Sequence, residues 1–145
     1  NYNGYIYLST NFYFIKNMGK YRLRKHERIS KKKIINTLFE GGSKSFCIYP
    51  IRMVYTLIDN SDSPVSILIT VPKRKMKNAV DRNRIKRQVR EAYRQKKKDL
   101  IEVLEKKENN IIVGFIYVGD KLYSSERVSK CIDSLLCYLI EKYQE

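Results

Sequence analysis

The sequence predicts a single α+β domain in the order αββαβα, a sandwich in which helices pack on one mixed sheet of the four-stranded type. Its 145 residues are enough to bury one hydrophobic core but too few to form two cores of ordinary size. Three segments rich in β-branched and aromatic residues are typical of strands. Around them, apolar residues recur at helical spacing. Strands interspersed with helices in this way favour one sheet covered by helices.

Residues 1–17 differ in composition from the remainder of the chain. They are rich in Asn and aromatic residues and hold one charged side chain, Lys16, whereas the basic character begins after Met18. We therefore expect Met18 to be the natural start. Residues 1–17 would then be a flexible or non-native extension, and residues 18–145 would form the domain. A genuine edge strand or a flexible arm is the alternative for residues 1–17.

A short first helix is expected after Ser30, whose hydroxyl can cap it. Gly41 and Gly42 would end this helix. Its apolar side, which we expect to pack on the sheet, carries Ile34, Ile35, Leu38 and Phe39.

Three strands are expected in the rest of the domain. Residues 45–58 (SFCIYPIRMVYTLI) are interpreted as one strand that is bent or bulged at Pro50. A turn cluster follows, and residues 65–71 (VSILITV) form the second strand. Residues 111–118 (IIVGFIYV) are almost entirely apolar, which predicts a strand at the centre of the sheet.

The last helix is the most regular periodic segment. After a cap at Ser124 or Ser125, apolar residues recur at the spacing of one helix face. They are Val128, Cys131, Ile132, Leu135, Leu136 and Leu139.

The helix between the second and third strands combines an apolar side with a cationic side. Asn78 can cap its start, and Asp81 places a negative charge near the positive end of the helix dipole. The apolar side carries Ile85, Val89, Ala92 and Tyr93. Another side carries Asn83, Arg87, Arg90 and Arg94.

The positive charge of the chain is concentrated around this helix. Residues 73–98 contain 13 Lys or Arg residues against two acids, a net +11 of the whole chain's +15. Like charges on one helix repel each other, and a polyanion relieves that repulsion while releasing condensed counterions. The loop before the helix adds Lys73, Arg74, Lys75 and Lys77 near backbone N–H groups that favour phosphate. The pattern therefore favours nucleic acid over a merely solvated face.

Other classes of partner and chemistry fit the sequence less well. No apolar run approaches the roughly 18–20 residues of a membrane span. The three cysteines, Cys47, Cys131 and Cys137, have no CxxC spacing and are interpreted as free, mostly buried thiols in a reducing cytoplasm. The single histidine, His26, lies among charged residues and is expected at the surface. Zinc chemistry and a histidine-based nuclease therefore lack suitable side chains.

The segment NAVDRNRIKRQVREAYR, residues 78–94, resembles the signature of the bacterial ribonuclease P protein component. The flanking segments agree with it: YRLRKHERI and LFEGG resemble the family's opening helix, ILITVPKRKMKN its strand and loop, and NNIIVGF its later strand. The resemblance covers residues 21–141. Pro72 departs from the family pattern, because a small polar residue is common there.

The resemblance implies a set of residues that contact a catalytic RNA: Arg82, Asn83, Arg84, Lys86, Arg87 and Arg90. Together with the four loop cations, Asn78 and Arg94, they form the expected RNA-binding surface. The resemblance also implies a cleft between the first helix and the sheet, which holds the single-stranded 5′ leader of precursor tRNA. By position, this cleft would be lined by Ile35, Phe39, Met53 and Tyr55, with plain core packing as the alternative for Phe39. It further implies a left-handed crossover between the second and third strands, although about 98% of such connections are right-handed.

The implied activity is that of the protein subunit of ribonuclease P, which matures the 5′ end of tRNA by hydrolysing a phosphodiester and leaving a 5′ phosphate. The chemistry would belong to the RNA subunit and to Mg²⁺ bound mainly by it, so no catalytic or metal-binding residue is expected in this chain. The expected partners are ribonuclease P RNA, with one protein per RNA, and precursor tRNA, with no membrane. A general or ribosomal RNA-binding protein is the main alternative, and a self-sufficient nuclease is the other.

Overall fold

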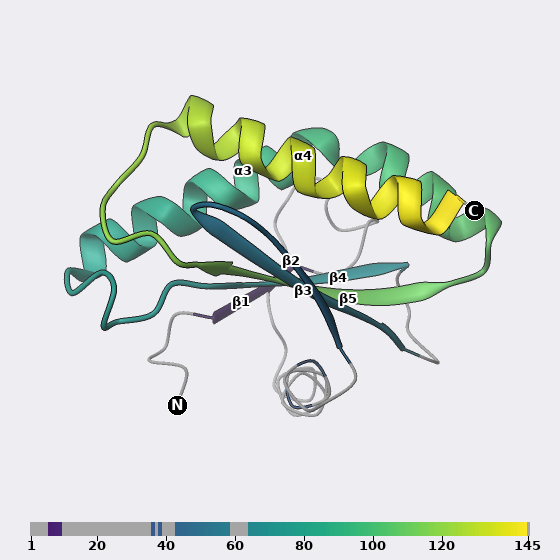
Figure 1. Ribbon diagram of the computed structural model, residues 1–145, viewed down its shortest axis with the longest axis horizontal. Helices are drawn as coiled ribbons and strands as arrows, with labels where there is room; N and C mark the ends of the chain where they lie inside the picture. Colours follow the sequence, from purple (N-terminus) through teal and green to yellow (C-terminus); the bar gives the residue numbers. More distant parts are fainter. Residues whose placement is uncertain (1–5, 10–35, 37, 39–42, 59–63, 145) are drawn as a thin grey trace.

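Two long helices cover one face of a five-stranded sheet in the computed structural model (Figure 1). The structure describes residues 6–9, 36, 38, 43–58 and 64–144. The elements are β1 (Ile6–Ser9), β2 (Lys44–Ile48), β3 (Ile51–Ile58), β4 (Val65–Thr70), α3 (Ala79–Lys106), β5 (Asn110–Tyr117) and α4 (Ser125–Gln144).

The sheet has the strand order β1-β4-β5-β3-β2. Only β4 and β5 are parallel, and α3 connects them, whereas the other neighbouring strands are antiparallel. Strands β2 to β5 thus form the predicted mixed four-stranded sheet, and β5 lies at its centre as expected. The α+β fold class is confirmed, and the handedness of the β4–α3–β5 connection stays a prediction.

The single bent strand predicted for residues 45–58 is wrong. The chain reverses at Tyr49 and Pro50, which are joined by a cis peptide bond, so that Ile48 pairs with Ile51 in an antiparallel hairpin. Strand-forming residues continue on both sides of a two-residue turn, so local composition does not separate a hairpin from one long bent strand. The pairing of β3 with β5 decides between them.

Residues 6–9 form strand β1 at the edge of the sheet, where they pair antiparallel with β4. An edge strand is the alternative that the sequence left open for the N-terminal segment. Whether residues 1–17 belong to the natural protein stays a prediction.

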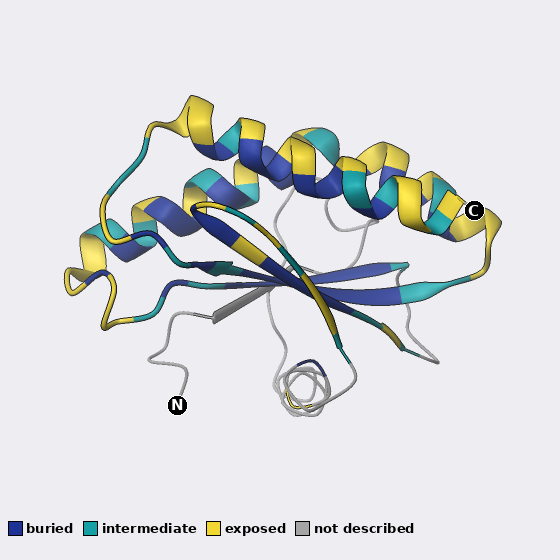
Figure 2. Ribbon diagram, viewed as in Figure 1, coloured by how far each residue is buried: buried dark blue, intermediate teal, exposed yellow. Residues whose placement is uncertain are grey.

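The apolar sides of α3 and α4 pack on the sheet, as their spacing predicted. Figure 2 shows the buried residues of both helices turned towards the strands. The buried positions include every member of the two predicted stripes: Ile85, Val89, Ala92, Tyr93, Val128, Cys131, Ile132, Leu135, Leu136 and Leu139. This layer is the main core of the domain.

The opposite face of the sheet holds a second, smaller core. Helical Leu38 is 1% exposed there and packs with Val54, Leu68 and Ile112. A Cβ atom at Gly114 would lie 2.8 Å from Leu38 Cδ2, so glycine allows the close approach of Leu38 to β5. Ile34, Ile35 and Phe39, predicted on the same helix, lie outside the described residues.

The two predicted helix caps have different outcomes. Ser124 Oγ accepts a hydrogen bond of 3.1 Å from the backbone N–H of Arg127, which confirms the cap of α4. Asn78 occupies the N-cap position of α3, but its side chain makes no cap hydrogen bond to the backbone. Its amide instead donates to Asp81 Oδ2 at 3.3 Å.

Candidate nucleic-acid interface

One end of the sheet gathers the segments that carry the predicted site. Parallel β4 and β5 end together, with Thr70 opposite Ile116, and Tyr117 lies opposite Ile51 just after the β2–β3 turn. The loop of residues 72–78, the start of α3 and the start of α4 therefore meet at this end, on the left of Figure 1.

The loop before α3 presents its cations to solvent from a defined turn. Lys73, Arg74, Lys75 and Lys77 are all exposed. The backbone N–H groups of Lys75 and Met76 both donate to the carbonyl oxygen of Pro72, at 3.0 and 3.1 Å. Met76 is buried in the main core and anchors the turn. The positive charges are thus held beside the N-terminus of α3, where exposed N–H groups also favour anions.

Arg82 has a different role from the one predicted. Its side chain is 2% exposed, and Nη1 donates to the carbonyl oxygens of Met76 and Lys77, both at 2.7 Å. Charge-assisted bonds to two successive carbonyls fix the end of the loop against α3. The prediction of a direct RNA contact by Arg82 is corrected to a positioning role.

Lys86 is also buried rather than open to a ligand. Its side chain is 0% exposed. Burial lowers the pKa of its ammonium group to about 8, and the positive charges of Arg82 and Arg90 add to the shift. The family resemblance placed Lys86 among the RNA-contacting residues, but the fold buries its side chain, which corrects the predicted direct contact.

Among the predicted RNA-binding residues of α3, Arg84, Arg87 and Arg94 are exposed, while Asn83 and Arg90 are half-buried. Within the described residues, neither Arg84 nor Arg87 makes an ion pair. Their guanidinium groups are therefore available to phosphate oxygens, for which the planar fork is well suited.

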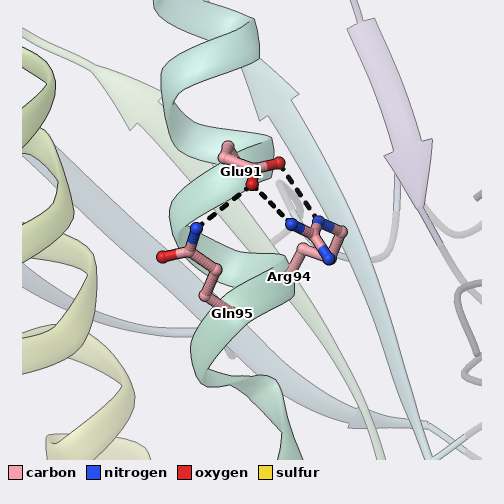
Figure 3. A network of polar contacts seen from close by, with 3 residues as sticks. All are labelled: Glu91, Arg94 and Gln95. Carbon is pink, nitrogen blue, oxygen red and sulfur yellow. Dashed lines mark hydrogen bonds and ion pairs between the residues drawn. The ribbon is translucent and has the colours of Figure 1, made fainter.

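Arg94 differs from Arg84 and Arg87 because it already has an acidic partner. Its Nε donates to Glu91 Oε2 at 3.1 Å, and its Nη2 donates to Glu91 Oε1 (Figure 3). Gln95 Nε2 also donates to Glu91 Oε1, at 3.1 Å. The hydrogen bond from Arg94 holds the pKa of the Glu91 carboxyl below its usual range, so the pair persists at neutral pH.

An open groove of about 560 Å³ runs between α3 and the start of α4. It is lined by Arg84, Arg87, Gln88, Glu91, Ala92, Gln95, Ser125, Glu126 and Ser129. Gln88 Nε2 bridges the two elements by donating to Tyr123 O at 3.2 Å and to Ser125 Oγ at 3.0 Å. Sequence reasoning missed this role of Gln88, because its partners lie 35 and 37 residues away.

The predicted leader-cleft residues do not share one face of the sheet. Met53 and Tyr55 are buried in the main core beneath α3 and α4, whereas Leu38 of the first helix packs on the opposite face. Because side chains alternate along a strand, these two residues cannot line a cleft beside Leu38, which corrects their predicted placement. Ile35 and Phe39 lie outside the described residues.

Two other features bear on the classes of function. In the part of the chain that the structure describes, no group of three or more His, Cys, Asp or Glu side chains could hold a metal ion. No helix among those residues combines the length and apolar character needed to cross a membrane.

Comparisons with known proteins agree with the motif. The family model "Ribonuclease P" matches residues 23–131. The "Ribonuclease P protein component" of Porphyromonas gingivalis (strain ATCC 33277) is 38% identical over 115 residues, which span 79% of this chain and 83% of that protein. The proteins of the same description from Chlorobium phaeobacteroides and Chlorobaculum tepidum are each 40% identical, over 87 and 83 residues. These cover 57% and 53% of this chain and 59% and 54% of the relatives. The chain thus belongs to the family of bacterial ribonuclease P protein components.

Proposed function

We propose that this chain is the protein subunit of ribonuclease P, which binds the catalytic RNA and the 5′ leader of precursor tRNA and thereby promotes endonucleolytic tRNA 5′ maturation. The observation that carries the proposal is the exposed Arg84 and Arg87 of the RNRIKR motif beside the cationic loop of residues 72–78. This arrangement places four loop cations and two arginines at one end of the domain.

The cationic loop, Arg84 and Arg87 would bind the phosphate backbone of the RNA subunit. Each neutralised phosphate releases condensed counterions, so the binding constant falls steeply as salt rises. Arg82 would act indirectly, because its bonds to Met76 and Lys77 hold the loop in place. Charge neutralisation of this kind also assists compaction of a folded RNA, which is itself limited by phosphate repulsion.

The hydrolytic chemistry would be supplied by the RNA subunit with Mg²⁺ bound mainly by that RNA. The donor set of the described residues does not suit a protein-held metal ion, since it includes no cluster of three His, Cys, Asp or Glu side chains. No step is therefore assigned to Mg²⁺ on this chain. Its own residues would bind and orient RNA, with one protein per ribonuclease P RNA. The free thiols of Cys47, Cys131 and Cys137 are consistent with activity in the cytoplasm. Only Cys131 is buried, however, which corrects the expectation that most of these thiols are buried.

The leader would lie on the sheet face beside Leu38. By strand alternation from Val54, this face also receives the exposed Arg52 and the half-buried Thr56 of β3. A positive charge beside an apolar surface suits single-stranded RNA, because the bases can pack on the apolar side chains while the phosphates stay in water. Arg52 and Thr56 thus replace Met53 and Tyr55 as the candidates from β3.

Reconstitution tests the proposed function. Purified chain, a bacterial ribonuclease P RNA and a precursor tRNA are mixed at a Mg²⁺ concentration at which the RNA alone cleaves poorly. We expect the chain to restore cleavage that leaves a 5′ phosphate, and to do nothing without the RNA. Binding without restored cleavage would instead indicate a general RNA-binding protein. Cleavage by chain freed of all RNA would indicate a self-sufficient nuclease.

A further inference from the structure

Two tyrosines join the β2–β3 turn to the loop before α4. Tyr49, in the turn, is 48% exposed and is one of three large hydrophobic side chains in the described residues that are exposed. Its ring meets that of Tyr123 edge to face, with centroids 5.9 Å apart and planes at 85°. The Tyr123 hydroxyl donates to the Tyr49 hydroxyl at 3.3 Å. The aromatic pair thus holds one ring at the surface in a fixed orientation.

Two cations lie against the same pair. The Arg127 guanidinium carbon is 4.1 Å from the centroid of the Tyr123 ring, and Lys121 Nζ is 5.5 Å from it. Within the described residues, neither cation makes an ion pair. One acid is near: the pKa of Tyr49 is raised by its hydrogen bond with Tyr123 and, more weakly, by the negative charge of exposed Asp120. The cluster formed by Tyr49, Tyr123, Lys121 and Arg127 therefore keeps a net positive charge even with Asp120 beside it.

The turn and the loop are tied to each other and to the core by several contacts. Val118 N donates to Pro50 O at 2.8 Å, and Cys131 Sγ donates to Ile48 O at 2.9 Å. The Tyr117 hydroxyl donates to Lys121 O, which fixes the loop that carries Lys121. A rigid support lowers the entropy lost when a ligand binds, so Tyr49 is well placed to act as a binding surface.

The cluster also continues the cationic surface of α3. Gln88 donates to Tyr123 O, and Gln88 lines the same groove as Arg84 and Arg87. The Tyr49 turn, the loop of residues 118–124 and the cationic loop all lie at one end of the sheet (Figure 1). An RNA strand bound to Arg84 and Arg87 could therefore extend over the start of α4 to the tyrosines.

We propose that Tyr49 is a stacking platform for an unpaired nucleobase of RNA, and that Arg127 and Lys121 bind the adjoining phosphates. Aromatic rings stack on bases of any identity, and nearby arginines add charge and planar contact. Arg127 already covers the Tyr123 ring, so Tyr49 offers the available aromatic surface. This inference rests on the proposed RNA-binding function and adds a contact outside the RNRIKR helix.

The test uses a single-stranded RNA oligonucleotide that carries one 5-iodouridine. Ultraviolet irradiation joins this base to an aromatic ring stacked on it, and mass spectrometry identifies the joined residue. We expect the cross-link at Tyr49. In a binding titration of the same oligonucleotide, Tyr49→Ala should weaken affinity by about tenfold or more. Tyr49→Phe keeps the ring but loses the hydroxyl, and it should bind within about twofold of the unchanged protein.

The controls separate stacking from damage to the fold and from failure of RNA binding as such. Leu57→Ala removes an exposed apolar side chain from the end of β3 opposite to the Tyr49 turn, and it should leave binding unchanged. Thermal unfolding checks that every variant folds, and Arg127→Gln provides a second variant that should also weaken binding. Equal losses in Tyr49→Phe and Tyr49→Ala, or a cross-link that avoids Tyr49, would overturn the proposal. If the unchanged protein binds neither this oligonucleotide nor ribonuclease P RNA, the proposed function itself fails.

Discussion

The guanidinium of Arg82 donates a 2.7 Å hydrogen bond to the backbone carbonyl oxygen of Met76 from a position that is almost completely buried. One arginine of the RNRIKR motif thus stabilises the loop before α3, while Arg84 and Arg87 of the same motif are exposed to solvent. This division of roles within six consecutive residues leads to separable effects on stability and on binding.

Arg82→Ala should lower the free energy of unfolding by about 2–3 kcal/mol, because it removes charged hydrogen bonds and leaves two carbonyl groups without that partner. Arg84→Ala, at an exposed position two residues away, should change it by no more than about 0.5 kcal/mol. Urea denaturation followed by circular dichroism measures both. Equal stability of the two variants would contradict the positioning role of Arg82.

The double variant Arg84→Ala, Arg87→Ala should bind ribonuclease P RNA more weakly and flatten the slope of log K against log salt by about one to two units. The matched control removes two exposed cations from the last turns of α3 and α4, Lys106→Ala with Lys142→Ala. The control variant loses the same charge, but its two substituted positions lie at the ends of α3 and α4 that are far from Arg84 and Arg87. A slope that falls equally in both double variants would mean that net charge, and not this surface, governs binding.

Glu91→Gln should strengthen RNA binding, because it releases the Arg94 guanidinium from its ion pair and removes a negative charge from the groove. We expect the salt slope to steepen by about one unit. Glu102→Gln removes the same charge from an exposed position further along α3 and should have little effect. Filter-binding titrations over a salt series give the comparison, and unchanged binding by Glu91→Gln would show that Arg94 does not reach the RNA.

Burial of Lys86 should make the stability of the protein depend on pH. The folded pKa is about 8 and the ordinary value is 10.5. Between these values the unfolded chain binds more protons than the folded protein, so the contribution of Lys86 to the free energy of unfolding rises with pH across that window. Below about pH 8 both states are protonated and the full cost of burying the charge remains.

Lys86→Met isolates this contribution, because it keeps a long side chain without the titrating group. The stability of the unchanged protein minus that of Lys86→Met should increase from pH 8 to pH 10. Subtraction removes opposing effects such as that of Cys131, whose thiol has a pKa raised by burial to about 11. A difference that stays flat over this range would show that Lys86 is not charged differently in the two states.

Much of the fold followed from local patterns in the sequence. The spacing of Ile85, Val89 and Tyr93 in α3, and of Val128, Ile132 and Leu139 in α4, identified the sides that pack on the sheet. The apolar run of β5 predicted its central place. These patterns are reliable because burial of one helix side or one strand depends on periodicity along a single element.

The errors arose where the outcome depended on a second element. The turn at Tyr49 and Pro50 could not be distinguished from a bent strand without the pairing of β3 with β5. Met53 and Tyr55 were assigned to the wrong face, because the strand alternation shows which residues share a face but not which helix covers it. The Tyr49–Tyr123 contact joins residues that are 74 positions apart, and no local pattern predicts it.

The sequence by itself thus determined the family, the cationic character and the docked side of the central helix. The +11 charge of residues 73–98 and the RNRIKR motif are properties of the chain in any conformation. Only the tertiary structure decided which cations are exposed. Arg82 and Lys86 carry the same charge as Arg84 and Arg87, but the folded protein buries the first pair and leaves the second exposed. A helix sets the direction of each side chain, whereas exposure depends on what packs against that direction.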